Sequence, residues 1–189
     1  MALMPQTFLL PVLGILLVTS EWSARAGLVT FTLEPRRGLV VLAKTVAAVV
    51  LGLAGLALLL GVAAVATVVG GTGDEAWDVG GRELGYFAML QTGAILQGVA
   101  FGLLLMSSTA AIVLYFALPV AMNLLVQLVP AVRDSAAWID LATSQAPLYA
   151  QAALNVQQWS QVGVTALLWV GLPMLGGYLR LRRREITTA

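Results

Sequence analysis

Charged side chains with a spacing that could do chemistry fall in two short stretches of this chain. Residues 74–83 carry four carboxylates, Asp74, Glu75, Asp78 and Glu83. Carboxylate oxygens are the ligands that Ca²⁺ and Mg²⁺ prefer. The stretch contains no histidine and no repeated ligand spacing, so we interpret it as a solvated acidic loop and predict no metal site. Residues 21–44 are instead basic, with Arg25, Arg36, Arg37 and Lys44.

Two missing residue types narrow the chemistry further. The chain has no cysteine, which excludes disulfides, iron–sulfur clusters and thiol catalysis, and no histidine, the commonest general base and haem ligand. The phosphate-binding pattern G-x-x-x-x-G-K-[ST] does not occur. We therefore expect a protein that is not itself an enzyme and binds no cofactor. The basic residues flank apolar runs instead of forming one broad patch, which argues against nucleic-acid binding.

The composition predicts an all-α integral membrane protein. Of 189 residues, 60% are hydrophobic and only 10% are charged, against about 25% charged in soluble domains. The mean hydropathy is +0.93. Apolar runs too long for barrel strands must cross lipid as helices, at ~20 residues a span. We expect one domain, 1–189, with five transmembrane helices near 3–20, 40–69, 85–106, 109–130 and 162–179.

Charge asymmetry predicts how these helices are oriented. Residues 21–44 and 180–189 hold eight of the ten basic residues, whereas the connections 70–84 and 131–161 hold only Arg82 and Arg133. The positive-inside rule puts the first set in the cytoplasm. The N-terminus is then outside, the C-terminus is cytoplasmic, and the segment 131–161 is external. A basic structured segment between two spans is a natural place to meet a cytoplasmic partner.

The stretch E-W-S-x-R-x-G-L-V-T-F-T-L-x-P-R-R-G-x-x-x-x-A-K resembles the segment after the second membrane helix of bacterial ABC-2-type ABC transporter permeases. The similarity is carried by Glu21, Arg25, Gly27, Thr30, Thr32, Pro35, Arg36, Arg37 and Lys44. The resemblance implies a multi-pass exporter subunit of the bacterial plasma membrane, whose coupling segment, 21–38, docks on a separate ATPase subunit. ATP and Mg²⁺ would bind that partner, and a second permease chain would complete a homodimer or heterodimer.

The chain departs from this family at its beginning. Family members usually have six spans, and this chain begins at what would be their second. A start assigned too late, a shortened chain and a reduced permease are the three explanations. The main alternative function is a non-transport structural or accessory subunit of a membrane complex. A membrane enzyme acting on lipid would need a catalytic cluster that the sequence does not contain.

Polar and small residues inside the predicted spans suggest how the helices pack. Gln91, Gln97, Asn123 and Gln127 are the main polar residues there. Such groups form hydrogen bonds between helices or line a substrate path, and we favour the first interpretation. Gly98 with Gly102, and Ala48 with Gly52, are small-residue pairs that serve either folding or dimerisation.

The external segment is expected to form two short helices, 135–145 and 147–160, divided at Pro147. Asp134 or Ser135 is the expected N-cap of the first helix. The resemblance implies that these helices dip towards the outer leaflet and help to gate the exit. A structured loop without a gating role is an equally good interpretation of the same composition. Met106 to Thr109 predicts a tight helical hairpin between the third and fourth spans.

Overall fold

The computed structural model describes residues 4–23, 37–70 and 80–183, and these residues are almost entirely helical. No strand occurs within these three ranges, which confirms the predicted all-α class. The elements are α1 (Met4–Ser23), α3 (Arg37–Gly70), α4 (Gly81–Leu105), α5 (Ser108–Leu128), α6 (Pro130–Ile139), α7 (Leu141–Tyr149), α8 (Val156–Ala166), the π-helical turn η2 (Leu167–Gly171) and α9 (Leu172–Arg183).

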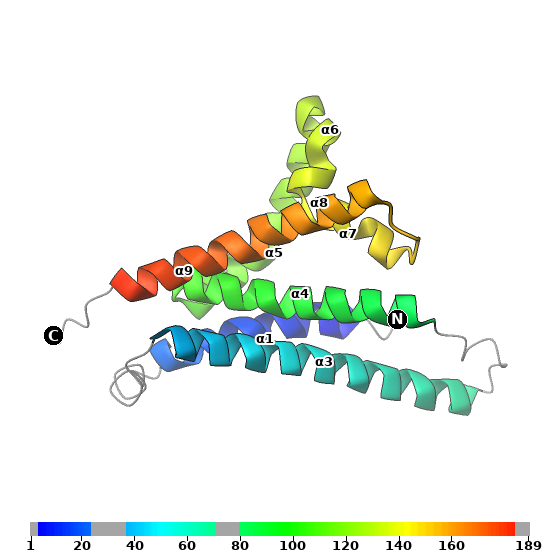
Figure 1. The fold of residues 1–189 in the computed structure, drawn as a ribbon, viewed down its shortest axis with the longest axis horizontal. Coiled ribbons are helices and arrows are strands. Elements are labelled where there is room, and N and C mark those ends of the chain that lie inside the picture. Colours follow the sequence, from blue (N-terminus) through cyan, green and yellow to red (C-terminus); the bar gives the residue numbers. More distant parts are fainter. Residues whose placement is uncertain (1–3, 24–36, 71–79, 184–189) are drawn as a thin grey trace.

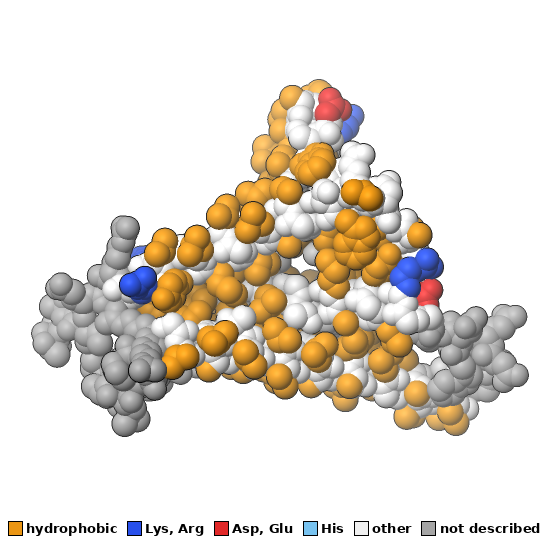
Figure 2. All heavy atoms as spheres, in the orientation of Figure 1, with side chains coloured by type: hydrophobic (Ala, Val, Ile, Leu, Met, Phe, Trp, Pro, Cys, Tyr) orange, Lys and Arg blue, Asp and Glu red, His pale blue; other side chains and the backbone are white. Residues whose placement is uncertain are grey.

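Four helices are long and apolar enough to cross a membrane. They are Gly38–Gly70, Gly81–Leu105, Ser108–Leu128 and the continuous helix Val156–Arg182. The first predicted span appears as a shorter apolar helix, Phe8–Ser20, within α1. Figure 2 shows apolar side chains along these helices and charged ones near their ends. These features are those of a membrane protein, while the count of five spans and the orientation of the termini stay predictions.

Helix α4 is the centre of the bundle. Over half of its apolar window is buried, against 6% for the window of α5. Helices α1, α3 and α9 all pack on α4, and α1 runs parallel to it (Figure 1). The tightest contact is with α1, where a Cβ atom on Gly98 would overlap the carbonyl oxygen of Pro11, and a Cβ on Gly14 that of Ile95. Glycine is required at both positions because only hydrogen fits between the two backbones.

The other small residues also pack against α4. Ala48 is fully buried, and a Cβ on Gly52 would lie 3.3 Å from the Thr92 Cα. On the opposite side, a Cβ on Gly177 would lie 2.6 Å from the carbonyl carbon of Leu103, so α9 also approaches α4 closely. Both small-residue pairs predicted from sequence therefore serve packing within this chain.

A sharp corner joins α4 to α5, as the spacing predicts. Met106 adopts a left-handed conformation with φ 51° and donates its N–H to the Gly102 carbonyl at 2.9 Å. Ser107 then caps α5 by accepting the Ala110 N–H at 3.4 Å. From this corner α5 diverges from α4 (Figure 1). Pro119 lies inside α5, which continues without interruption to Leu128.

The predicted helices 135–145 and 147–160 are wrong in their boundaries. The chain breaks at Asp140, which caps α7 by accepting the Thr143 N–H at 2.9 Å, and Pro147 lies inside α7. A second break spans 150–155. The helix beyond it starts with a reciprocal cap, in which Asn155 and Gln158 each accept the backbone N–H of the other at 2.9 Å. Helix α6 begins at Pro130, so neither Asp134 nor Ser135 is its N-cap.

Candidate binding cavity

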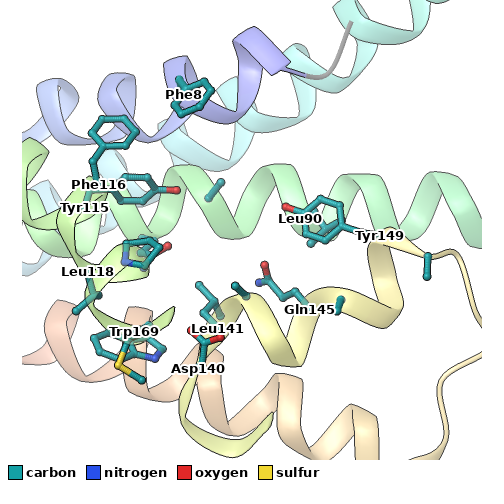
Figure 3. A pocket seen from close by; sticks show the side chains of 17 residues that line it. Phe8, Leu90, Tyr115, Phe116, Leu118, Asp140, Leu141, Gln145, Tyr149 and Trp169 are labelled. Carbon is teal, nitrogen blue, oxygen red and sulfur yellow. The ribbon is translucent and has the colours of Figure 1, made fainter. Parts of the chain in front are cut away.

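A cavity of about 800 Å³ lies between α1, α4, α5, α7 and the π-helical turn. Most of its lining is apolar. Figure 3 shows Phe8, Tyr115 and Phe116 on one side and Asp140 and Gln145 on the other, with Trp169 beside Asp140. A concave, mostly apolar space with a few convergent polar groups is the usual form of a small-molecule site.

Aromatic rings on α1 and α5 form one wall of the cavity. The Phe8 and Phe116 rings lie 5.8 Å apart, and Tyr115 and Phe116 meet edge to face at 5.3 Å. Phe101 supports Tyr115 from behind at 6.3 Å and is itself 2% exposed. These distances and tilts are those that aromatic pairs favour, so the wall is held by packing before any ligand binds.

Polar side chains line the opposite wall. Asp140 is 8% exposed, and its Oδ2 accepts the Thr143 N–H at 2.9 Å and the Thr143 hydroxyl at 2.6 Å. Gln97 enters from α4 and is 6% exposed. Tyr149 lies at the end of α7, and burial raises the pKa of its phenol above the ordinary tyrosine value. Among the described residues that line the cavity, Asp140 is the only charged one.

The π-helical turn positions Trp169 at the cavity. An extra residue in this turn displaces the helix locally, and such turns are frequent at functional sites. The Trp169 indole N–H donates to the Ile139 carbonyl at 2.7 Å. This bond satisfies a carbonyl next to the break between α6 and α7. It therefore joins the last apolar helix to the segment that carries Asp140.

Helix α7 is held against its neighbours by a second polar contact and by a small apolar cluster. The hydroxyls of Ser144 and Thr165 lie 2.7 Å apart in a buried position between α7 and α8. Leu148 is 1% exposed and packs with Tyr86, Leu90 and Val162. The cavity thus has an aromatic wall on α1 and α5, supported by Phe101 of α4, and a second wall fixed through α7 to the last helix.

Of the four polar residues suggested for a substrate path, one lines the cavity. This residue is Gln97. Gln91 is buried on α4 but is absent from the lining. Asn123 and Gln127 are exposed on α5, also outside the lining, and Gln127 Nε2 donates to Asn123 Oδ1 at 2.5 Å within the same helix. A substrate path through these four residues stays a prediction.

The predicted coupling segment lies largely outside the described residues. Glu21 falls in the last turns of α1 and Arg37 begins α3, with no side chain described at either position. The rest of the segment is undescribed: Arg25, Gly27, Thr30, Thr32, Pro35 and Arg36. The ends of α1 and α3 that flank it lie together at one end of the bundle (Figure 1).

Basic side chains donate to helix carbonyls at this same end. Lys44 Nζ donates to the Leu17 carbonyl of α1 at 2.8 Å, and Arg180 Nη1 donates to the Leu104 carbonyl of α4 at 2.9 Å. Leu104 lies in the last turn of α4, where a cation is favourable because the terminal carbonyls are unpaired. The structure therefore places Lys44 and Arg180 at one end of the bundle, while the orientation of that end stays a prediction.

Sequence reasoning missed Asp140, Trp169 and the aromatic wall as parts of a site. One signal for Asp140 was present, since it is the only charged residue between Asp134 and Arg180. Of the four acidic residues in the stretch 74–83, only Glu83 is described. Within the described ranges, no group of three or more acidic side chains could hold a metal ion.

Comparison of the chain with protein families, with curated proteins and with solved structures finds no match.

Proposed function

We propose that this chain is the permease subunit of an ATP-driven exporter of the ABC-2 type in a bacterial plasma membrane. Its substrate would be amphipathic or apolar. The observation that carries the proposal is an aromatic-lined cavity inside a bundle of apolar helices whose basic end adjoins the segment that resembles a coupling helix. The chain carries no nucleotide-binding motif, so energy must come from another polypeptide.

The packing suggests how movement of a partner would reach the cavity. The coupling segment joins α1 to α3, and both helices pack on α4 through small residues that leave no room for sliding. A displacement of the segment would therefore move α1, α3 and α4 together. The ring contacts of Phe8 with Phe116 and of Phe101 with Tyr115 join α5 to this group, and α7 lies on the other side of the cavity. Relative movement of these two groups would open or close the space between them.

A second permease chain has apolar surface available to it. Outward-facing residues on α5 include Val113, Val120 and Leu128, which are 61%, 61% and 75% exposed. Such surface is covered by lipid or by another membrane chain. In the proposed exporter, part of it would contact the second permease.

The test is affinity purification of the full chain in mild detergent, with co-purifying chains identified by mass spectrometry. Replacing Arg36 and Arg37 by Glu is expected to remove a stoichiometric soluble partner that contains G-x-x-x-x-G-K-[ST]. The matched control is Arg182→Glu, which reverses a charge at the same end of the bundle, and it should retain the partner. Recovery of membrane chains alone would overturn the coupling role and favour a structural subunit.

A further inference from the structure

Asp140 combines deep burial with an unused carboxylate oxygen. Its Oδ2 accepts both bonds from Thr143, whereas Oδ1 has no hydrogen bond to any described residue. Capping a helix needs only one neutral oxygen, which serine, threonine or asparagine supplies as well as aspartate does. The cap itself therefore does not need a full negative charge. The N-terminus of α7 stabilises that charge only in part, and burying it costs free energy unless it is paired.

No basic side chain of the described residues neutralises this charge. The nearest one along the chain is Arg133, on α6. Its guanidinium donates to the carbonyls of Val126 and Gln127, at 3.4 and 3.0 Å, and so caps α5 instead. The other described residues that line the cavity are uncharged. The carboxylate thus faces an 800 Å³ space with its charge unpaired by any described side chain.

Aromatic rings surround the same space. Trp169 lies beside Asp140, and Tyr115 and Phe116 form the facing wall (Figure 3). Ring faces attract cations, tryptophan most strongly, and the attraction grows where water is excluded. Gln97 and Gln145 add amide oxygens that can accept further hydrogen bonds. A carboxylate among aromatic rings in an apolar cavity matches a ligand with a positive charge on an apolar body.

We infer that this cavity is a binding site for a freely diffusing lipophilic amine or similar organic cation, with Asp140 as the anionic anchor. The ammonium donates to Asp140 Oδ1, and the apolar body lies against Tyr115, Phe116 and Trp169. The inference rests on the proposed function for its meaning as a transport substrate, but the binding site itself does not depend on an ATPase partner.

The probe is dansylcadaverine, an aromatic sulfonamide that ends in a primary ammonium, with its N-acetylated neutral form as the matched ligand. Binding is measured by equilibrium dialysis on the full chain in nanodiscs, with empty nanodiscs subtracted. We expect the wild type to prefer the charged form by at least about tenfold, the usual worth of a charge-assisted hydrogen bond. Asp140→Asn keeps the capping oxygen and should abolish this preference. Asp134→Asn removes an exposed charge on α6 and should leave the preference unchanged.

Equal binding of the two ligands by the wild type would overturn the inference without recourse to any variant. A preference that survives in Asp140→Asn would overturn the role of Asp140. Phosphatidylglycerol nanodiscs contain no lipid ammonium, so they are compared with nanodiscs containing phosphatidylethanolamine. Loss of probe binding in the second set would assign the site to a lipid headgroup and overturn the free ligand. If an ATPase is captured but the wild type does not prefer the charged ligand, this inference is wrong and the proposed exporter stands. If the charged ligand is preferred but no ATPase is captured, the proposed exporter is wrong and the binding site stands.

Discussion

Adding one methyl group at Gly98 is expected to force α1 away from α4. The new Cβ would overlap the carbonyl oxygen of Pro11 and lie 2.9 Å from its carbonyl carbon and 3.1 Å from its Cα. All three atoms belong to the backbone, so no rotamer change can relieve the overlap. Overpacking of this kind costs about 1–3 kcal/mol. Replacing glycine by alanine also favours any helix by up to about 1 kcal/mol, so a matched control is needed.

Gly93 provides that control on the same helix. A Cβ there meets nothing within 4 Å, so Gly93→Ala gains the helix propensity without the overlap. Because that gain is common to both variants, their difference isolates the overpacking term. We expect Gly98→Ala to be less stable than Gly93→Ala by about 1–3 kcal/mol. The measurement is unfolding in mixed micelles with increasing SDS, followed by tryptophan fluorescence. Coincident unfolding midpoints would refute the close packing of α1 on α4.

Two further predictions concern the contacts that fix α7. Trp169→Phe keeps one aromatic six-membered ring but removes the indole N–H that donates to the Ile139 carbonyl, so we expect a loss of at least about 1–2 kcal/mol in the same assay; an unchanged midpoint would contradict the bond. A double-mutant cycle of Ser144→Ala and Thr165→Ala should give a coupling near 0.6 kcal/mol, the average for hydrogen bonds between membrane helices. Strictly additive effects would show that these two hydroxyls do not interact.

Local sequence signals predicted the corner between α4 and α5 well. Ser107 and Ser108 form a polar pair between two long apolar runs, which indicates a connection between two helices. A connection this short predicts a tight turn. The glycine pairs were harder to interpret, because a small-residue spacing marks a packing face without naming the helix that covers it. That Gly98 meets Pro11 depends on two segments almost ninety residues apart, and no pattern within one helix contains this information.

The segment after α5 shows why a single strong residue can mislead. Pro147 predicts a break, since proline removes a backbone donor and disfavours helix in the residue before it. The observed helix boundaries follow the side-chain caps instead of the proline. Asp140 starts α7 seven residues before the proline, and Asn155 with Gln158 starts the next helix. In α7, Pro147 costs one hydrogen bond near the end of a helix that stops two residues later, which is a modest loss.

The cavity could not be predicted for a related reason. Its residues come from Phe8 in α1 to Trp169 in the last helix, and each has an ordinary explanation in its own segment: aromatic packing, a helix cap, or an apolar span. Only the assembled bundle brings them to one space. One wall is fixed by glycine contacts between α1 and α4, the other by the bonds of Trp169 and Ser144. Because Asp140 and the aromatic wall are carried by different helices, a ligand that binds both together would bind one relative position of the two walls more tightly than others.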